Sequence, residues 1–289
     1  MSIVLIVADR AEEPQVAISR GLQLAAKMGW GAQVVGFAYE NLDELKSAGV
    51  DPQEVKKKLL DKRKSDVHAE VEKLKGDVRT AVNVVWHKAI HQWIDEQCER
   101  KEYAAVIKTG HRTETFLYTS TDWHLLRECP APVMIAAEKK WRATKPIVAA
   151  IDLSSKSRVV QMLNDQVVAT AKRFAERLDT ELYLVHALHI PAVLTELDLV
   201  DEFSHVKKMK QELHPKVQKL AQAHGLPMSS IKLKKGPVDK VITSESARLK
   251  AQLVVMGTVG RKGVKGQLLG NTAEKVLTRL RTDVLAIKP

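Results

Sequence analysis

The chain contains 289 residues, 45% of them hydrophobic and 4% aromatic, and its formal net charge is +11. This length fits two domains of about 150 residues, and no apolar stretch approaches the roughly 20 residues that span a bilayer, so the composition predicts a globular cytoplasmic protein without membrane partners. The positive charge could attract nucleic acid or a phosphorylated ligand, but the scarcity of aromatic residues argues against a base-stacking surface, and we expect no specific nucleic-acid partner.

The first half begins with an apolar strand, Ile3 to Asp9, that ends in a carboxylate. The early acid also makes this segment too short for a signal peptide. A helix and a second strand, Gln33 to Ala38, follow, and then a charged helical segment over 42–74. The basic runs Lys56–Lys58 and Lys62–Lys64 in this segment alternate with apolar residues at helical spacing, which is typical of a solvated helix face.

Strands and helices continue to alternate through the rest of the first half. We predict strands over 82–86, 103–107 and 133–136, and a helix over 90–98. Cys98 and Cys129 are too few for a disulfide framework and lack the paired spacing of a zinc site. We interpret both as buried, reduced thiols.

Several side chains of the first half could bind a ligand other than a nucleotide, and the sequence does not decide this question. His87, His91, His111 and His124 are candidate metal ligands, and His87 and His91 have the i, i+4 spacing that can place two ligands on one helix face. We favour a partly exposed polar cluster. Trp86, Trp93 and Trp123 would suit a pocket for a small apolar ligand, with core packing as the favoured alternative.

The same order of elements recurs in the second half, after a polar linker that ends at Pro146. We predict strands over 147–152, 182–187, 231–233, 253–256 and 284–287, and helices over 202–224 and 238–249. Short runs of valine and isoleucine separated by helices are typical of parallel strands covered on both faces. The sequence therefore predicts two tandem doubly wound α/β domains, residues 1–137 and 146–289, each with a parallel five-stranded sheet.

A glycine-rich loop over 257–270 separates the fourth strand of the second half from the last helix. Its glycines let main-chain N–H groups approach an anion, and Asn271 and Thr272 open a helix whose N-terminus attracts phosphate. Arg261, Lys262 and Lys265 add positive charge. The loop matches neither the Walker signature nor the compact Gly-x-Gly-x-x-Gly, so a flexible surface loop is the alternative.

Gly257, Gly260 and Gly270 reproduce the spacing Gly-x2-Gly-x9-Gly, and the loop resembles the signature of ATP-binding universal stress proteins. The likeness covers essentially the whole chain and is nearest to a tandem bacterial form of the family, on the segments 84–87, 121–127 and 269–274. It implies the adenine nucleotide alpha hydrolase-like strand order 3-2-1-4-5 and a role in stress response. It also implies ATP, ADP or AMP in the second domain, and leaves open whether Mg²⁺ accompanies the phosphates.

The resemblance also assigns individual residues. Asp152 would contact the ribose or adenine side, and Ala187 would line the adenine pocket through its backbone. The ribose and phosphates would be held by Gly257, Gly260, Gly270, Asn271 and Thr272. Asn271 stands where the family has a hydroxyl residue, and because an amide can also donate to a phosphate oxygen, we expect binding to be altered rather than abolished.

The first half has lost this loop, since its corresponding segment is about three residues shorter. Thr109 falls where Gly257 lies and Thr119 where Gly270 lies. Asp122 brings a negative charge to the first turn of the helix, where an anion would otherwise sit. We therefore expect that the first half does not bind ATP.

The resulting hypothesis is a stress regulator that holds a nucleotide and presents a surface to protein partners that the sequence does not identify. No catalytic residue can be named, and a slow ATPase or nucleotidyl transferase using the same crevice is the alternative. The resemblance further implies that the strands over 133–135 and 284–287 pair the two halves as a pseudo-dimer, and it leaves a homodimer of chains open.

Overall fold

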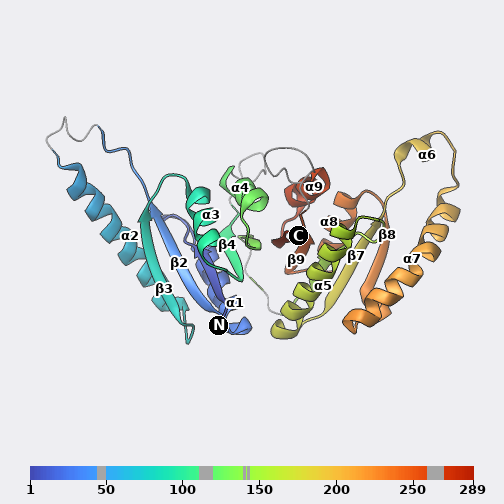
Figure 1. Cartoon of the computed structure of the whole chain (residues 1–289), viewed down its shortest axis with the longest axis horizontal. Coiled ribbons are helices and arrows are strands. Elements are labelled where there is room, and N and C mark those ends of the chain that lie inside the picture. Colours follow the sequence, from blue (N-terminus) through green and yellow to red (C-terminus); the bar gives the residue numbers. More distant parts are fainter. Residues whose placement is uncertain (44–49, 111–119, 139–140, 142–143, 259–269) are drawn as a thin grey trace. The chain divides into compact units, whose positions relative to one another are not determined.

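The computed structural model describes residues 1–43, 50–110, 120–138, 141, 144–258 and 270–289. The chain folds into two compact units, Met1–Glu138 and Lys139–Pro289, each of which repeats the same order of strands and helices (Figure 1). Among the helices of the described residues, none is long and apolar enough to cross a membrane. The predicted pairing of the two halves through their last strands stays a prediction.

In the first unit the sheet has the order β3-β2-β1-β4-β5, and all neighbouring strands are parallel. The strands are β1 (Ile3–Val7), β2 (Gly31–Ala38), β3 (Thr80–Trp86), β4 (Ala105–Thr109) and β5 (Val133–Ala136). Every residue of β4 and β5 is buried, whereas β3 at the edge of the sheet is partly exposed. The apolar runs of β4 and β5 are thus covered on both faces of the sheet.

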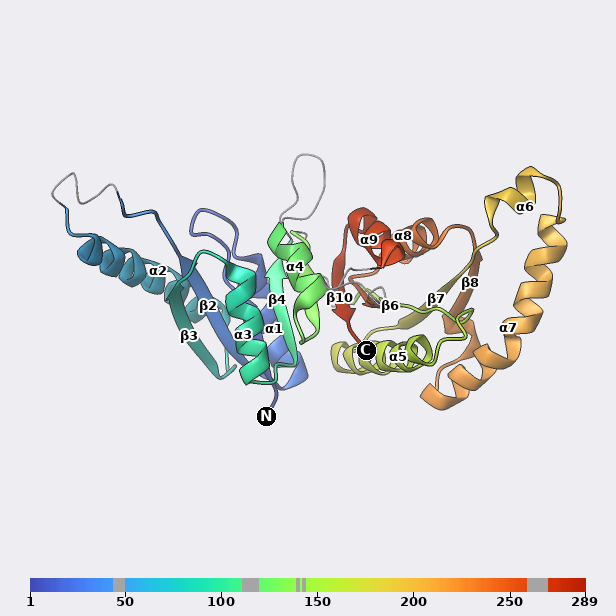
Figure 2. The same cartoon turned by 45° about the horizontal axis from the view of Figure 1, so that its top comes forward.

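The described residues of the first unit form the α-helices α1 (Val16–Met28), α2 (Pro52–Leu74), α3 (Ile90–Arg100) and α4 (Ser120–Glu128). α1 packs against α2, and α3 packs against α4. Right-handed crossovers put one pair on each face of the sheet, and Figure 2 shows α3 and α4 together on the near face.

The long basic helix starts later than expected, at Pro52 rather than at Leu42. Asp51 caps it by accepting a hydrogen bond of 2.9 Å from the Gln53 amide, and proline is well suited to the first helical position. Val67 and Val71 are its buried residues, and Lys57, Lys58, Lys62 and Lys64 are exposed, as expected of a solvated face. Arg63 differs from these lysines, because it is partly buried and donates to the backbone oxygens of Ala8 and Asp9.

The second unit repeats this arrangement with the order β8-β7-β6-β9-β10, again with parallel neighbours throughout. Numbered within the unit, this is the predicted order 3-2-1-4-5 read along the sheet, which confirms the expected fold class. Its elements are β6 (Ile147–Ala150), α5 (Arg158–Leu178), β7 (Leu182–Leu188), α6 (Ala192–Glu196), α7 (Glu202–His224), β8 (Ile231–Lys235), α8 (Val238–Arg248), β9 (Leu253–Gly257), α9 (Asn271–Arg279) and β10 (Asp283–Ile287).

Candidate functional site

A cavity of about 530 Å³ opens at the carboxyl ends of β6, β7 and β9 in the second unit. β6 and β9 are neighbours in the sheet, and the chain leaves them in opposite directions, so the cavity lies at the switch point where open parallel sheets bind ligands. Its volume falls within the roughly 300–1,000 Å³ of small-molecule sites. The lining also includes the first turns of α5, one side of α8 and the start of α9.

Most of the predicted site residues meet at this cavity. The lining residues that the sequence singled out are Asp152, Ala187, Gly257, Gly270 and Thr272. Asn271 is the first residue of α9 and is exposed, but it is not part of the lining. Gly260 and the three loop cations lie outside the described residues.

Asp152 is exposed and is held in place by its neighbours. The carboxylate accepts hydrogen bonds from the backbone amides of Ser154 (2.9 Å) and Ser155 (3.3 Å). The side chain of Asn164, on α5, both accepts from the Asp152 amide (3.0 Å) and donates to its carbonyl oxygen (2.7 Å). Asn164 therefore fixes the backbone of Asp152 and leaves the carboxylate open to the cavity.

Gly257 is the last residue of β9, and α5 packs closely over it. A Cβ atom at this position would lie 2.5 Å from Cδ2 and 2.6 Å from Cγ of Leu163, nearer than real carbon atoms approach. Any side chain at this position would therefore require Leu163 to move, whatever part Gly257 has in binding a ligand.

The N-terminus of α9 has the properties of an anion site. Gly270 precedes it with φ −63° and ψ 140°, and no side chain of the described residues caps this end. The first N–H groups of a helix have no partner within the helix, and the helix dipole adds partial positive charge there. Because Gly270 and Thr272 line the cavity, these N–H groups lie at its border.

His186 and Ser154 also line the cavity, and sequence reasoning did not select them. His186 is buried in β7, its Nε2 lies 3.2 Å from Ser154 Oγ, and its Nδ1 lies 3.2 Å from the Ile151 carbonyl oxygen and 3.3 Å from the Leu153 amide. Burial lowers the pKa of His186, so the ring is neutral at pH 7. A polar side chain within an apolar strand is the signal that could have found it.

In the first unit the residue that corresponds to Asp152 faces inward. β4 ends at Thr109 as β9 ends at Gly257. The Thr109 hydroxyl donates to the Asp9 carboxylate (2.7 Å), and its oxygen accepts from the Ala17 amide (2.9 Å). Asp9 is 4% exposed, so its carboxylate is bound within the protein rather than offered to a ligand.

A buried ion pair stands beside this contact. Lys108 Nζ lies 2.8 Å from Asp122 Oδ1, and both side chains are less than one-tenth exposed. Both residues have a counterpart in the second unit. Lys108 corresponds to Met256, since each precedes the last residue of its strand (β4 and β9). Asp122 corresponds to Ala273, since each is the third residue of its helix (α4 and α9). Met256 and Ala273 line the cavity of the second unit, so the first unit replaces two apolar lining residues by an internal salt bridge.

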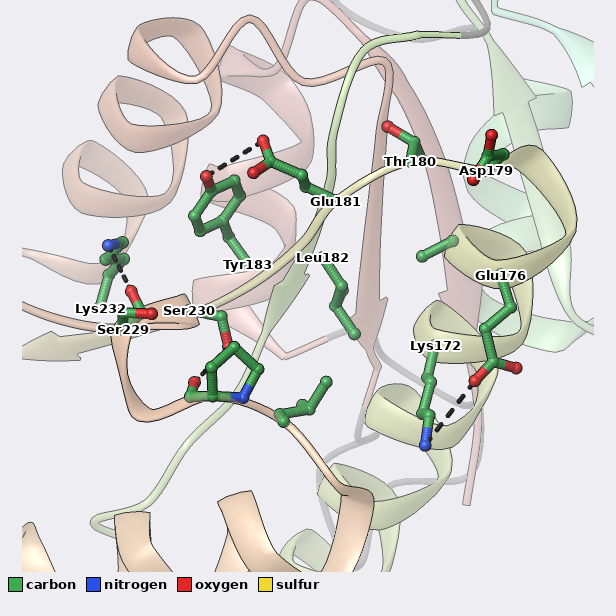
Figure 3. Close-up of a pocket in the computed structure, with 13 residues that line it drawn as sticks. Lys172, Glu176, Asp179, Thr180, Glu181, Leu182, Tyr183, Ser229, Ser230 and Lys232 are labelled. Atoms are coloured by element: carbon green, nitrogen blue, oxygen red, sulfur yellow. Dashed lines mark hydrogen bonds and ion pairs between the residues drawn. The ribbon is translucent and has the colours of Figure 1, made fainter.

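A second cavity of the second unit, about 480 Å³, lies at the amino end of β7 (Figure 3). Glu176, Asp179 and Glu181 contribute carboxylates to it, whereas its ammonium groups are those of Lys172 and Lys232. Lys172 Nζ lies 3.7 Å from a Glu176 oxygen and donates to the His224 carbonyl (2.7 Å). This negative balance disfavours a phosphate, so the cavity at the carboxyl ends is the better nucleotide candidate.

The histidines of the first unit do not follow the predicted helical spacing. His87 precedes α3, which begins at Ile90, so His87 and His91 do not share a helix face. His91 instead stacks on His124 of α4, with ring centroids 4.2 Å apart. Burial, followed by the charge of His124, lowers the pKa of His91. Within the described ranges no group of three or more histidine, cysteine or acidic residues could hold a metal.

Two tryptophans of the first unit pack on aromatic neighbours. Trp93 meets Phe37 edge to face at 5.4 Å, and Trp86 lies 5.8 Å from Tyr39. These contacts agree with the packing interpretation, while an apolar ligand of the first unit stays a prediction.

Comparison with known proteins matches the model of the "Universal stress protein family" to residues 1–137 and again to 143–288. Universal stress protein E of Escherichia coli K12 is 29% identical over 99% of this chain and 93% of its own length. A universal stress protein E homologue of Haemophilus influenzae is 27% identical over 99% of this chain and 97% of its own length. A putative universal stress protein structure from Pseudomonas aeruginosa covers 100% of this chain and 94% of its own, with a TM-score of 0.76 at 22% identity.

Proposed function

The chain belongs to the universal stress protein family of stress-response proteins, and we propose that its second unit binds an adenine nucleotide in the cavity at the carboxyl ends of β6, β7 and β9. The observation that carries the proposal is the convergence of Asp152, Gly257, Gly270 and Thr272 on that cavity. Asp152 stands more than a hundred residues from the other three, and all four come together beside a helix N-terminus that no described side chain caps.

Each part of the cavity suits a part of the nucleotide. The exposed Asp152 carboxylate is an acceptor for ribose hydroxyls, and the backbone at Ala187 offers hydrogen bonds to an adenine edge. The N-terminus of α9, with the Thr272 hydroxyl, suits the phosphates. Asn271 replaces the family's usual hydroxyl at the start of this helix, and its exposed amide can donate to a phosphate oxygen. A Mg²⁺ ion, when bound, would neutralise phosphate charge there.

The first unit supports the proposal by contrast, and we propose that it binds no adenine nucleotide. Its aspartate is bound to Thr109, and the Lys108–Asp122 pair holds a carboxylate in the first turn of α4. A phosphate at that helix end would meet a negative charge that is already there. A single nucleotide per chain is therefore expected.

The bound nucleotide is proposed to stabilise the second unit and to shape a surface for protein partners. A ligand that binds only the folded protein stabilises it by about 2.7 kcal/mol at a hundred times its Kd. Such linkage stabilises the protein without any turnover of the nucleotide.

A second candidate function is slow nucleotidyl or phosphoryl transfer, and one contact favours it. The Ser154 hydroxyl lies 3.2 Å from Nε2 of the neutral His186, which could accept its proton if the ring carries its own proton on Nδ1. Phosphate release that disappears in Ser154→Ala would support this activity, and release unchanged by that substitution would contradict it.

Nucleotide-dependent thermal stabilisation tests the main proposal. Gly270→Val is the sharper variant, since φ −63° is accessible to any residue and the substitution narrows the cavity entrance. It should abolish the shift in melting temperature caused by ATP, ADP or AMP, whereas Ser229→Val, at the cavity of Figure 3, should keep it. A full nucleotide-dependent shift in Gly270→Val would contradict the proposal. Mass spectrometry of small molecules released from the purified protein would identify the resident nucleotide.

A further inference from the structure

The two cysteines of the chain lie against each other in the first unit. Cys98 is on the last turns of α3, and Cys129 directly follows α4. Their sulfur atoms are 3.7 Å apart, and neither residue is part of a disulfide. Cys129 is 0% exposed, whereas Cys98 is only partly buried, which corrects the expectation that both are buried.

The surrounding contacts hold the two sulfurs in this position. α3 packs against α4, and the stacked rings of His91 and His124 join the same two helices about two turns before Cys98. Ile94, on α3 between His91 and Cys98, is fully buried, as is Leu125 on α4. The helices therefore bring the thiols together through a packed contact rather than through a loose segment.

The sulfurs are near enough to bond after a small movement. A disulfide has an S–S distance of about 2.05 Å, so the sulfurs must approach by roughly 1.7 Å, which side-chain rotation on a helix end can provide. Thiols that are partly exposed and lie next to a second thiol are the usual sites of reversible oxidation.

We propose that Cys98 and Cys129 are a peroxide-sensitive thiol pair that forms a reversible disulfide between α3 and the end of α4. The Cys98 thiolate attacks hydrogen peroxide, the O–O bond breaks, and Cys98 becomes a sulfenic acid as hydroxide leaves. The Cys129 sulfur then attacks the Cys98 sulfur, the S–O bond breaks and the sulfenic oxygen leaves as water. Overall, two thiols and one peroxide give one disulfide and two waters. A dithiol reductant restores the two thiols by thiol–disulfide exchange and becomes a disulfide itself.

Exposure assigns the order of these steps. Peroxide can reach Cys98 from solvent, while Cys129 reacts only with a partner already inside the fold. The cross-link closes the chain between residues 98 and 129, a segment that contains β4 and the ion-paired Asp122. Restricting that segment in the unfolded state should make the oxidised first unit harder to unfold.

The test uses the reduced full-length chain exposed to hydrogen peroxide, then unfolded in N-ethylmaleimide and weighed intact. The proposal predicts a loss of about 2 Da, no maleimide adduct, a monomeric band on a non-reducing gel, and two adducts after dithiothreitol treatment. Uptake of oxygen atoms in place of hydrogen loss, or disulfides only between chains, would overturn it.

Two single variants distinguish the cysteine that reacts with peroxide from the cysteine that forms the disulfide with it. In Cys129→Ser the folded protein should give a Cys98 sulfenic acid that dimedone traps, since no second thiol resolves it. In Cys98→Ser, Cys129 should stay unmodified at the same peroxide dose until urea unfolds the chain. Equal reactivity of Cys129 in folded Cys98→Ser would refute the proposed order and the pairing that depends on it.

Discussion

The buried pair Lys108–Asp122 allows a quantitative test of how the first unit closes its crevice. Asp122→Ala would leave the Lys108 ammonium buried without its counter-ion, and removing one partner of a buried pair costs about 3–5 kcal/mol. Lys108→Met should lower the free energy of unfolding by an amount in the lower part of that range. The remaining Asp122 carboxylate lies in the first turn of α4, where the helix dipole stabilises a negative charge by about 0.3–1 kcal/mol.

The double variant Lys108→Met/Asp122→Ala installs the residues that the second unit has at these positions, Met256 and Ala273, both buried there. Replacing a buried ion pair by apolar residues is often neutral or stabilising, and the lost volume of the aspartate offsets part of that gain. We expect the double variant within about 2 kcal/mol of the native protein, although the single losses add to about 6–10 kcal/mol. The coupling energy should therefore be at least about 4 kcal/mol.

Urea unfolding followed by tryptophan emission measures these losses in the first unit. The chain has five tryptophans, and the first unit holds all but Trp141, namely Trp30, Trp86, Trp93 and Trp123. Emission therefore reports mainly on the unit that carries the ion pair. A double variant that loses as much stability as the two single variants together would refute the reasoning, because the two charges would then not depend on each other.

Three further predictions concern the cavity and the histidines. Asn164→Ala removes two hydrogen bonds to a backbone beside the cavity, so it should cost about 1–3 kcal/mol and reduce the ATP-induced rise in melting temperature, while Gln161→Ala should not. Gly257→Val should lower the melting temperature of the nucleotide-free protein by overpacking worth about 1–3 kcal/mol, whereas Gly270→Val should leave it nearly unchanged. Because the pKa of His91 is lowered in the folded state, the unfolded state binds more protons below about pH 6.5, and the stability of the first unit should fall as the pH drops through that value. His91→Gln should flatten this dependence of the urea midpoint, and an unchanged slope would contradict the assignment.

The sequence predicts the sheet well, because strands depend on local patterns, and several residues that it selected for a nucleotide site line one cavity. Valine and isoleucine runs mark the strands, and the spacing of Gly257 and Gly270 marks the loop. The contact between Asn164 and Asp152 joins a helix to a strand end, and no local pattern encodes it. The meeting of Cys98 and Cys129 likewise depends on how two helices pack.

The residue at the end of the fourth strand differs between the two units, and so does the direction in which the aspartate of each unit faces. A buried carboxylate must be hydrogen-bonded, and Asp9 accepts from the Thr109 hydroxyl (2.7 Å) and from the Ala17 amide (3.2 Å). Gly257 offers no hydroxyl, and Asp152 turns outward, where it is exposed and can meet a ligand. A threonine at Gly257 would require Leu163 on α5 to move, because Leu163 occupies the space of its side chain. Thr109→Gly alone would leave a buried carboxylate short of a donor. The two units therefore pack this region in two different ways. To convert the second unit to the packing of the first, the residue at the end of β9 and Leu163 on α5 would have to be substituted together.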